Sequence, residues 1–361
     1  MENRQSVLEI SKKAFKENVK EIKNYIGNKD LMPVLKANAY GTYINRNLEL
    51  IKDFKIVAVA MVSEAIELRK IGFENEIFVL NQPYIEDIPN ILKYNISVGL
   101  ASKNFLEALE KYPFKVKVHL EIETGMGRTG IYIKDLENFI KLIKNNKNIE
   151  IEGVYTHFSV ADVDLEFTKE QIRKFEIGVN LVKKEFPNLK YIHSSASNGI
   201  LNFKEDICNL VRPGIILYGY EPFENAYNKI KLNPVATLKS KISFLKEIEP
   251  ETSISYGRKF ISKKRMKIAT IGIGYADGIR RILSNKGEVI IRGKREKIVG
   301  IICMDSFMVD VTDIDEVKEG DEVFIWDNKI ITLEEIAKKC DTINYEIISS
   351  IQDRVPRKFV D

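Results

Sequence analysis

The chain has 361 residues, which is more than a single small core requires, so we expect one large domain and a smaller one. Hydrophobic residues make up 44% and charged residues 30% of the sequence, a balance typical of globular rather than disordered proteins. Lys and Arg total 56 against 52 Asp and Glu, and the net charge of +4 is too even to indicate a nucleic-acid partner.

The sequence also argues against membrane insertion and secretion. No apolar run approaches the roughly 20 residues of a membrane-spanning helix, and the N-terminal segment MENRQSVLEISKKAF lacks the apolar core of a secretory signal. Cys208, Cys303 and Cys340 are odd in number and far apart, which is typical of a reducing compartment. None has a second Cys or a His at zinc-ligand spacing. We therefore expect a cytoplasmic protein with no metal and no membrane partner.

The first two thirds of the chain alternate short β-rich runs with amphipathic helical patterns. The first helical pattern places Phe15, Val19, Ile22 and Ile26 three and four residues apart, and Gly27 ends it. We expect strands at residues 7–10, 32–36, 56–61, 77–80, 96–100, 115–123, 152–158, 191–195 and 211–218. Repeated βα units indicate a parallel sheet with helices outside it.

About eight strands remain when the run at 7–10 is set aside, and that number suits a closed (β/α)8 barrel of the TIM type. An open doubly wound sheet is the alternative. The glycine-rich dinucleotide fingerprint is absent, because the turn after residues 32–36 reads ANAYGT. We therefore predict an α/β barrel over residues 1–225, with the strand at 7–10 available to the second domain.

From about residue 226, alternating runs replace the βα pattern. They lie at residues 241–245, 267–273, 288–291, 298–302 and 322–326. Turn signals such as RGK at 292–294 and KEG at 318–320 join them, and one short helical pattern lies near 333–339. We predict a smaller, mainly β domain over residues 226–361, with residues 221–234 as the connection.

Three of the predicted barrel strands carry polar residues at a spacing of two, so these residues share a face. The three faces hold His119, Glu121 and Glu123; Tyr155 and His157; and His193, Ser195 and Ser197. Polar groups inside a barrel cost free energy unless they are paired or bind a ligand. A satisfied hydrogen-bond network is one interpretation. A polar site at the C-terminal ends of the strands, where barrel enzymes place their chemistry, is the better one.

Lys36 falls at the end of the predicted strand 32–36, directly after Val34 and Leu35. Desolvation there favours the neutral amine, which can attack an aldehyde. A lysine reaching into solvent would be the simpler interpretation if this residue stood alone.

Nine motifs, in chain order, resemble those of the alanine racemases, which use pyridoxal 5'-phosphate (PLP). They are PVLKANAYG at 33–41, ETGMGRTG at 123–130, YTHF at 155–158, RPGIILYG at 212–219, SYG at 255–257, GYADG at 274–278, CMD at 303–305, NYE at 344–346 and RVPR at 354–357. They span nearly the whole chain. The family fold, a PLP-binding barrel followed by a β domain, agrees with the two domains predicted above.

The resemblance implies a two-base racemase. Lys36 would bind PLP covalently and act as the base on the D side, and Tyr256 would be the base on the L side. In this family the tyrosine reaches the active site of the partner subunit, so a head-to-tail homodimer is implied. Arg212 would donate a hydrogen bond to the pyridine nitrogen of PLP. His157 would lie beside Arg212 and Tyr256.

The resemblance also assigns binding residues. The phosphate ligands would be Tyr40, Ser197, Tyr345 and the backbone amides of Gly214 and Ile215. The substrate carboxylate would bind Arg128 and the backbone of Met304. The entrance corridor would be lined by Asp162, Tyr275 and Arg281.

The chain departs from the family pattern at three places, one of which is the segment SSAS at 194–197, where the Asn that often precedes the phosphate serine is missing. Many members carry a carbamylated lysine seven residues before the arginine of the MGR motif, and this chain has Glu121 there. A glutamate supplies an anion directly, so we predict that Glu121 pairs with Arg128. After Gly41, Thr42 and Tyr43 replace the usual His and Gly.

The resemblance favours interconversion of L-alanine and D-alanine, which would supply D-alanine for peptidoglycan. The ring of Tyr345 beside the phosphate favours a small side chain. One methylene changes selectivity by only about 1–3 kcal/mol, so a serine or broad-specificity racemase stays open. A PLP-dependent decarboxylase and a PLP-binding carrier are two further hypotheses. The pair Lys36 and Tyr256 argues against the decarboxylase, and the second domain argues against the carrier.

Overall fold

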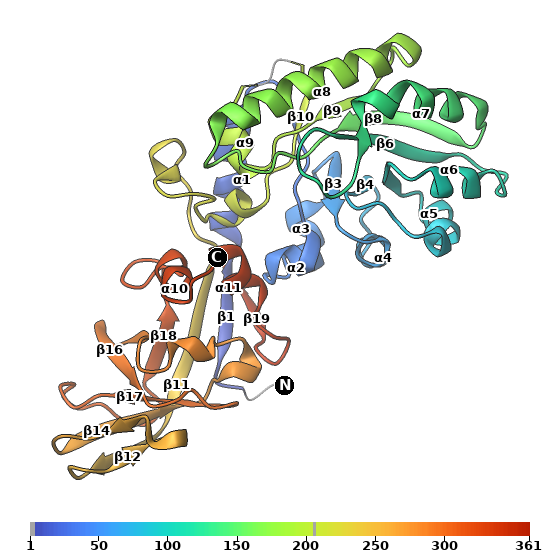
Figure 1. The fold of residues 1–361 in the computed structure, drawn as a ribbon. Helices are drawn as coiled ribbons and strands as arrows, with labels where there is room; N and C mark the ends of the chain where they lie inside the picture. The colour runs from blue at the N-terminus through green and yellow to red at the C-terminus, as the bar shows by residue number, and fades with distance from the viewer. Residues whose placement is uncertain (1–3, 205–206) are drawn as a thin grey trace.

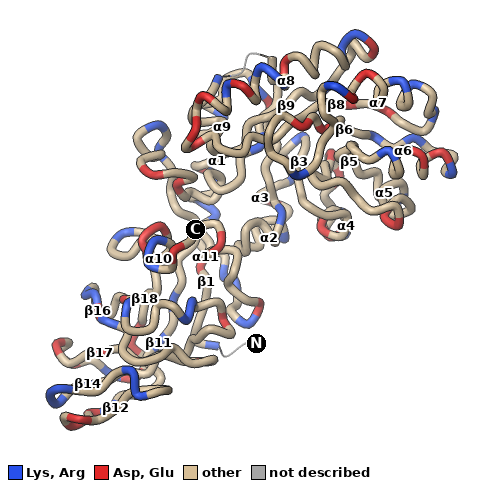
Figure 2. The backbone as a smooth tube through the Cα atoms, in the orientation of Figure 1, with Lys and Arg blue, Asp and Glu red and all other residues tan. Residues whose placement is uncertain are grey.

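The computed structural model describes residues 4–204 and 207–361, which form two domains (Figure 1). The parallel strands and most of the helices lie in the upper domain of this view, and the antiparallel strands lie in the lower one. Lys and Arg are interspersed with Asp and Glu along both domains (Figure 2), which agrees with the nearly even count of charges.

A ring of parallel strands forms the first domain. Its main sheet has the order β3–β4–β5–β6–β8–β9, with β7 on the side of β6, and β2 pairs with β10. The strands are β2 (Asp30–Leu31), β3 (Ile56–Val59), β4 (Glu76–Val79), β5 (Ser97–Leu100), β6 (Val116–Glu123), β7 (Ile131–Tyr132), β8 (Ile149–Tyr155), β9 (Tyr191–His193) and β10 (Leu210–Val211).

Backbone hydrogen bonds close this ring at both ends of the main sheet. The amide of Leu35 donates to the carbonyl of Ala58 on β3 (2.7 Å), and the amide of Asn209 donates to Ile192 on β9 (3.1 Å). Because β2 and β10 pair with each other, β2, β3, β4, β5, β6, β8, β9 and β10 encircle one interior. The TIM-like barrel predicted from the sequence is confirmed.

Helices cover the outside of the barrel. They are α1 (Lys12–Ile26), α3 (Leu48–Ile51), α4 (Val62–Lys70), α5 (Ile88–Lys93), α6 (Lys103–Leu109), α7 (Ile133–Asn145) and α8 (Leu165–Glu185). Two short elements, α2 (Lys36–Tyr40), whose backbone is left-handed, and α9 (Ser197–Asn202), line a cavity of the barrel instead. The hydroxyl of Ser11 caps α1 by accepting from the amide of Ala14 (3.0 Å), and Gly27 ends the helix at φ +65°, as predicted. Within 4–204 and 207–361, no helix has a long enough apolar stretch to cross a bilayer.

The second domain is built on a mostly antiparallel sheet of order β14–β17–β16–β15–β18–β11–β1–β19, in which β14 also pairs with β11. Its strands are β1 (Val7–Ser11), β11 (Ala236–Ile248), β14 (Met266–Ile271), β15 (Glu288–Ile291), β16 (Lys294–Val299), β17 (Phe307–Asp310), β18 (Glu322–Trp326) and β19 (Arg357–Val360). The small hairpin of β12 (Ser253–Ile254) and β13 (Phe260–Ile261) and the helices α10 (Leu333–Lys339) and α11 (Asn344–Ser349) complete it. The N-terminal strand β1 lies in this sheet, between β11 and β19.

Two predicted strands are wrong over most or all of their length. The strand predicted at 211–218 ends at Val211, and Ile215–Tyr218 forms a 3-10 helix. Pro213 has no amide hydrogen for a ladder, and Gly214 takes a φ of −110° and a ψ of −98° that no strand residue adopts. For the strand predicted at 32–36, the nearby strand β2 covers only Asp30–Leu31, which precede the predicted range. Lys36 begins α2, so the lysine does not end a strand.

A buried carboxylate joins the loops of the second domain. The side chain of Asp277 is fully buried, accepts from the amide of Gly274 (2.9 Å), and contacts Arg4 and Arg354. Arg354 also reaches Asp305 (2.6 Å), whose side chain is 61% exposed. Asp277 is therefore a buried anion that meets the half-buried Arg4 and the exposed Arg354, whereas Asp305 is itself exposed.

Replacing Asp277 by Asn should lower the free energy of unfolding by about 1.5–3 kcal/mol, because it removes a buried, charged acceptor that Arg4 and the amide of Gly274 contact. The matched substitution Asp305→Asn should cost less than about 1 kcal/mol, as for other exposed ion pairs. Urea unfolding followed by the fluorescence of Trp326, the single tryptophan, which is buried in this domain, measures both. Equal, small effects of the two substitutions would contradict this account.

Candidate active site

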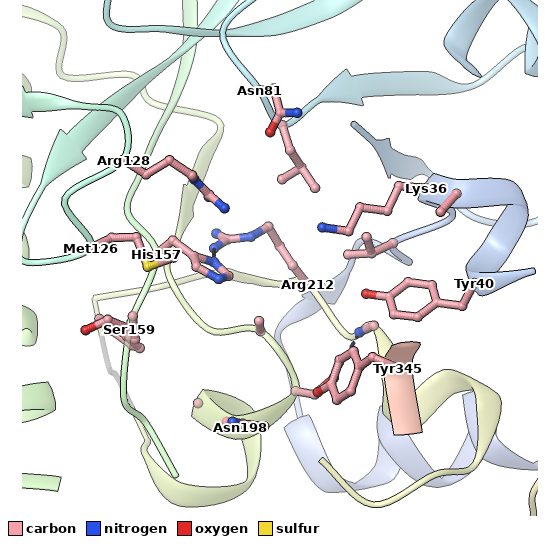
Figure 3. A pocket seen from close by; sticks show the side chains of 18 of the residues that line it. Lys36, Tyr40, Asn81, Met126, Arg128, His157, Ser159, Asn198, Arg212 and Tyr345 are labelled. Carbon is pink, nitrogen blue, oxygen red and sulfur yellow. Dashed lines mark hydrogen bonds between the residues drawn. The ribbon is translucent and has the colours of Figure 1, made fainter. Parts of the chain in front are cut away.

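A cavity of about 550 Å³ lies at the C-terminal ends of the barrel strands (Figure 3). Its walls are segments that follow β2, β4, β6, β8, β9 and β10, together with residues 343–349 at α11 of the second domain. Eight of the residues singled out in the sequence line it: Lys36, Tyr40, Arg128, His157, Ser197, Arg212, Gly214 and Tyr345. Polar groups from both domains therefore meet where barrel enzymes place their chemistry.

Lys36 and Tyr40 enter this cavity from a left-handed turn. Ala37, Asn38, Ala39 and Tyr40 have φ values of 53°, 53°, 53° and 56°, a conformation that costs about 1–2 kcal/mol for each residue with a Cβ. Within the turn, the amide of Gly41 donates to the carbonyl of Ala37 (2.8 Å). Strain of this kind persists only where the surroundings hold it, and such residues cluster at functional sites.

Glu64 at the start of α4 holds the beginning of the turn. One of its carboxylate oxygens accepts from the amide of Ala37 (2.6 Å), and the other accepts from the amides of Ala60 (2.8 Å) and Met61 (3.1 Å). The carboxylate therefore ties the first peptide after Lys36 to the loop that follows β3.

Arg357 of the second domain holds the end of the turn. Its Nε donates to the carbonyl of Gly41 (2.9 Å), and its Nη1 donates to the carbonyls of Gln352 and Val355 (both 2.7 Å). A Cβ on Gly41 would lie 2.7 Å from the carbonyl oxygen of Ile348, so the two domains touch there through bare backbone.

Tyr43, one of the departures from the family motif, joins this contact. Its ring lies between Arg46 and Arg357, with guanidinium carbons 3.9 Å and 4.5 Å from the ring centroid, and its hydroxyl donates to Asp353. Tyr43 takes a φ of +62°, which explains why glycine suits this position in the family motif. Here the cation–π contacts offset the strain.

The amine of Lys36 points into the cavity toward Arg212 (Figure 3). Burial lowers the pKa of Lys36, and the nearby charges of Arg128 and Arg212 lower it further, while Glu64 acts in the opposite direction. These surroundings therefore shift the amine toward its neutral form.

Arg212 occupies the centre of the site and is only 2% exposed. Its Nη2 donates to the carbonyls of Ser194 (2.6 Å) and Thr156 (2.8 Å), and its Nη1 donates to His193 Nδ1 (2.6 Å). His157 Nδ1 lies 3.4 Å from the same Nη2. Burial first, then the positive charge of Arg212, lowers the pKa of His157 to about 3, so this imidazole is neutral.

Hydroxyl groups line the opposite end of the cavity. Ser197 accepts from the amide of Gly214 (3.0 Å), and Tyr40 and Tyr345 lie beside each other with ring centroids 6.1 Å apart. A Cβ on Gly214 would come within 2.3 Å of the Tyr40 hydroxyl, so only glycine permits this approach. The predicted ligand Ile215 follows Gly214 and is fully buried.

The predicted ion pair between Glu121 and Arg128 is wrong. The Glu121 carboxylate accepts hydrogen bonds from Thr129 Oγ1 (2.7 Å) and Tyr155 Oη (3.0 Å), and among the described residues no ion pair joins it to Arg128. Arg128 is exposed on the cavity wall, whereas Glu121 is buried in β6. Glu121 therefore supports the loop beside Arg128 through the neighbouring threonine and does not contact the guanidinium.

Three predicted residues lie together at the surface of the second domain, away from the cavity of their own chain. Tyr256, Met304 and Tyr275 are 69%, 51% and 41% exposed. The amide of Tyr275 donates to the carbonyl of Cys303 (3.0 Å), and the hydroxyl of Ser255 donates to the carbonyl of Ile301 (2.5 Å). The loops of Tyr256 and Tyr275 are therefore both hydrogen-bonded to the segment that carries Met304. Arg281 is also exposed on this domain.

Asp162 lies at the surface beyond β8, outside the cavity lining. Its charge reaches Tyr345, whose pKa is raised by burial first and then by Tyr40 and Asp162. That proximity agrees with a position near the entrance.

The sequence reasoning did not assign site roles to Tyr155 and Asn81, which also line the cavity. Tyr155 shares a strand face with His157, and the alternation at a spacing of two already placed it among the polar groups of the barrel, without a role of its own. Its hydroxyl lies 2.8 Å from the carbonyl of Leu80 as well as beside Glu121. Asn81 follows β4 directly, and a polar residue after a strand carries no specific signal.

Comparison with known proteins agrees with this geometry. A family model described as the alanine racemase N-terminal domain matches residues 10–222, and one described as the alanine racemase C-terminal domain matches residues 235–359. The chain belongs to the alanine racemase family. This is a family of isomerases.

Full-length relatives carry the same name. An alanine racemase of Halothermothrix orenii is 40% identical to this chain over 97% of it and 96% of its own length. The structure of an alanine racemase from Clostridium difficile 630 superposes with a TM-score of 0.92 at 33% identity, covering 99% of this chain and 96% of that one. One from Bacillus anthracis with bound L-Ala-P has a TM-score of 0.91 at 33% identity, with coverages of 99% and 95%.

Because Glu121 is buried, we expect its ionisation to make the free energy of unfolding depend on pH. Burial raises the pKa of Glu121 above 4.5, although Thr129, Tyr155 and Arg128 act to lower it. A raised pKa in the folded state means that the contribution to stability is present below the unfolded pKa and is lost as pH rises through the folded one. In Glu121→Gln, the unfolding free energy should therefore fall less than in the wild type as pH rises above about 4.5.

Urea unfolding followed by circular dichroism at several pH values measures this difference. Glu150→Gln, at an exposed position on β8, is the control and should leave the wild-type pH profile unchanged. A Glu121→Gln profile parallel to that of the wild type would mean that ionisation of Glu121 does not destabilise the folded state.

Proposed function

We propose that this chain is a PLP-dependent racemase that interconverts L-alanine and D-alanine. The observation that carries the proposal is the arrangement inside one cavity of a lysine amine with a lowered pKa, a buried arginine and a group of hydroxyls. Membership of the alanine racemase family supports alanine as the substrate.

The cavity fits PLP in three respects. Ser197, Tyr40 and Tyr345 offer hydroxyl donors for a phosphate, and Gly214 leaves room beside the Tyr40 hydroxyl that a Cβ would fill. The amine of Lys36 would bind the aldehyde carbon. Arg212, which only donates hydrogen bonds, would face the pyridine nitrogen and leave it unprotonated. When bound, PLP would withdraw the electron pair left on the substrate α-carbon after its proton is removed.

The side chains divide the remaining work between binding and proton transfer. Arg128, exposed on the cavity wall, would bind the substrate carboxylate with the backbone of Met304. On the D side, the Lys36 amine would take the α-proton or return it. On the L side, the hydroxyl of Tyr256 would do the same, so that a proton leaves one face of the α-carbon and another arrives at the opposite face.

Tyr256 requires a second subunit for this role. It is exposed on the second domain and does not line the cavity of its own chain. In the proposed head-to-tail homodimer, the loops of Tyr256, Met304 and Tyr275 would close the partner's cavity. His157 is neutral with Nδ1 facing Arg212, so its Nε2–H would be available to donate to the incoming tyrosine oxygen.

A small substrate suits the walls of the cavity. Tyr345 and the residues around it bring α11 of the second domain against the hydroxyl end, which limits the room for a side chain. Serine differs from alanine by one hydroxyl, and a pocket of this kind discriminates weakly against it. We further propose that the enzyme acts in the cytoplasm, where D-alanine would be made for peptidoglycan. Its three free cysteines support that location.

Lys36→Ala should abolish both racemisation and exchange of the substrate α-hydrogen, because one of the two bases and the covalent hold on PLP are lost together. Exchange into L-alanine and D-alanine in deuterium oxide, followed by NMR with chiral analysis, measures both. Lys103→Ala, an exposed lysine on α6, is the control. Carbon dioxide is assayed in parallel, and its release in place of racemisation would identify a decarboxylase.

Tyr256→Phe should lower kcat by roughly 100- to 10,000-fold, the usual contribution of a general base. If the sites are shared, mixed dimers of the Tyr256→Phe and Lys36→Ala subunits contain one site with both bases. Unfolding and refolding the two variants together should therefore restore activity that neither has alone. A Tyr256→Phe enzyme that works normally in both directions would reject the two-base assignment, and mixing without any recovery would reject the shared site.

A further inference from the structure

Two histidines behind Arg212 form a column that the proposed reaction does not use. His119 on β6 and His193 on β9 are fully buried, and Nδ1 of His119 lies 2.8 Å from Nε2 of His193. On its other side, Nδ1 of His193 lies 2.6 Å from Nη1 of Arg212. The column therefore connects the interior of the barrel to the guanidinium that reaches the cavity.

The contact of His193 with Arg212 and its contact with His119 are both satisfied by one tautomer of each ring. A guanidinium only donates hydrogen bonds, so Nδ1 of His193 must accept, and the hydrogen of that ring is on Nε2. This hydrogen points to Nδ1 of His119, which must accept in turn and leaves the hydrogen of His119 on its own Nε2. Burial first, then the charge of Arg212, lowers the pKa of His119 to about 3 and that of His193 well below its ordinary value, so both rings are neutral.

Packing alone does not account for a histidine at the far end of the column. The His119 ring stacks on Phe78 with centroids 4.2 Å apart and an interplanar angle of 19°. Its Nε2 is buried, and none of the described protein groups accepts a hydrogen bond from it. Phenylalanine would keep the stack without bringing a polar edge into the core. What only the histidine supplies is the lone pair of Nδ1.

We propose that His119 is a positioning residue for Arg212 and acts through the tautomer of His193. The acceptor on His119 keeps the hydrogen of His193 on Nε2, and the lone pair on Nδ1 of His193 then holds Nη1 of Arg212. Without that acceptor, the hydrogen of His193 can move to Nδ1, where it meets an N–H of the guanidinium and displaces it. The inference rests on the proposed function only for the role of Arg212 toward PLP.

Two substitutions separate hydrogen bonding from packing. His119→Phe keeps a ring against Phe78 and removes the acceptor. His119→Asn loses the ring and keeps an amide oxygen close to the position of Nδ1. A hydrogen-bonding role predicts that Asn preserves function better than Phe, whereas a packing role predicts the reverse. Thermal unfolding provides the fold control, because the loss of the stack should make the Asn variant the less stable of the two.

The first readout needs neither PLP nor activity. The chain has only three histidines, so the apo enzyme labelled with 15N-histidine gives three imidazole systems, and each His119 variant identifies its own missing signal. Long-range 15N–1H correlation should show His193 protonated only at Nε2 in the wild type and in His119→Asn. In His119→Phe, a population protonated at Nδ1 should appear.

The second readout is kinetic and uses the loaded enzyme. His119→Phe should lower kcat about ten- to hundredfold, the equivalent of one hydrogen bond to a charged group, while His119→Asn should retain most of it. The proposal is overturned if His193 in His119→Phe stays protonated only at Nε2, or if the Phe variant is as active as the Asn variant. A wild-type enzyme that does not racemise alanine would reject the proposed function, and the NMR result on the apo enzyme would still decide the role of His119.

Discussion

The structure of the site depends on one buried cation, the guanidinium of Arg212. Moving a cation out of water costs several kcal/mol unless acceptors replace the lost hydration, and here the acceptors are the carbonyls of Thr156 and Ser194 and an imidazole nitrogen of His193. They come from the segments that follow β8 and β9, so the guanidinium also fixes how these two strand ends lie. Burial lowers the pKa of His157 and of Lys36, and the charge of Arg212 lowers both further.

The second constraint is the left-handed turn that presents Lys36 and Tyr40 to the same cavity. Four consecutive residues with positive φ do not form in an isolated chain at equilibrium. Glu64 of the barrel fixes one end of the turn, and Arg357 of the second domain fixes the other. The second domain therefore has two separate roles, because it supports the lysine of its own chain and carries Tyr256 at a distant surface. A weaker contact between the domains would therefore change the backbone conformation around Lys36, and so the position of its amine in the cavity.

The sequence predicted the parts of the fold that periodicity encodes. Alternation at a spacing of two placed His119, His157 and His193 inside a barrel, and the regular βα order predicted its strands. It did not distinguish the strand at Leu210–Val211 from the 3-10 helix at Ile215–Tyr218, because every residue of that segment is buried and its apolar pattern carries no period.

The same distinction holds for the site, where local sequence patterns predict some residues and contacts between distant segments determine others. Tyr345 lies about 300 residues after Lys36 in another domain, so only the family motif, and no local pattern, connects the two. The ion pair predicted between Glu121 and Arg128 was wrong for a related reason. Because Glu121 replaces the carbamylated lysine of the family by another anion, we expected it to have the same partner, Arg128. Its hydrogen-bond donors are instead Thr129 and Tyr155, which lies on the next strand of the sheet. Which neighbour a buried carboxylate finds depends on strand register, which composition does not reveal.

The electrostatics of the cavity are those of a receptor for anions. Lys36, Arg128 and Arg212 all reach it, and the carboxylates nearby are engaged elsewhere: Glu64 by backbone amides, Glu121 by two hydroxyls, and Glu346 by Arg280 at 2.7 Å. An excess of positive charge disfavours protonation of the lysine, and the proposed attack of its amine on an aldehyde would need the neutral form. A phosphate and an amino-acid carboxylate would each lower that excess. Bound anions would therefore raise the pKa of the Lys36 amine again. In the proposed reaction, this rise would help the amine to carry a proton when it is not bonded to the cofactor carbon.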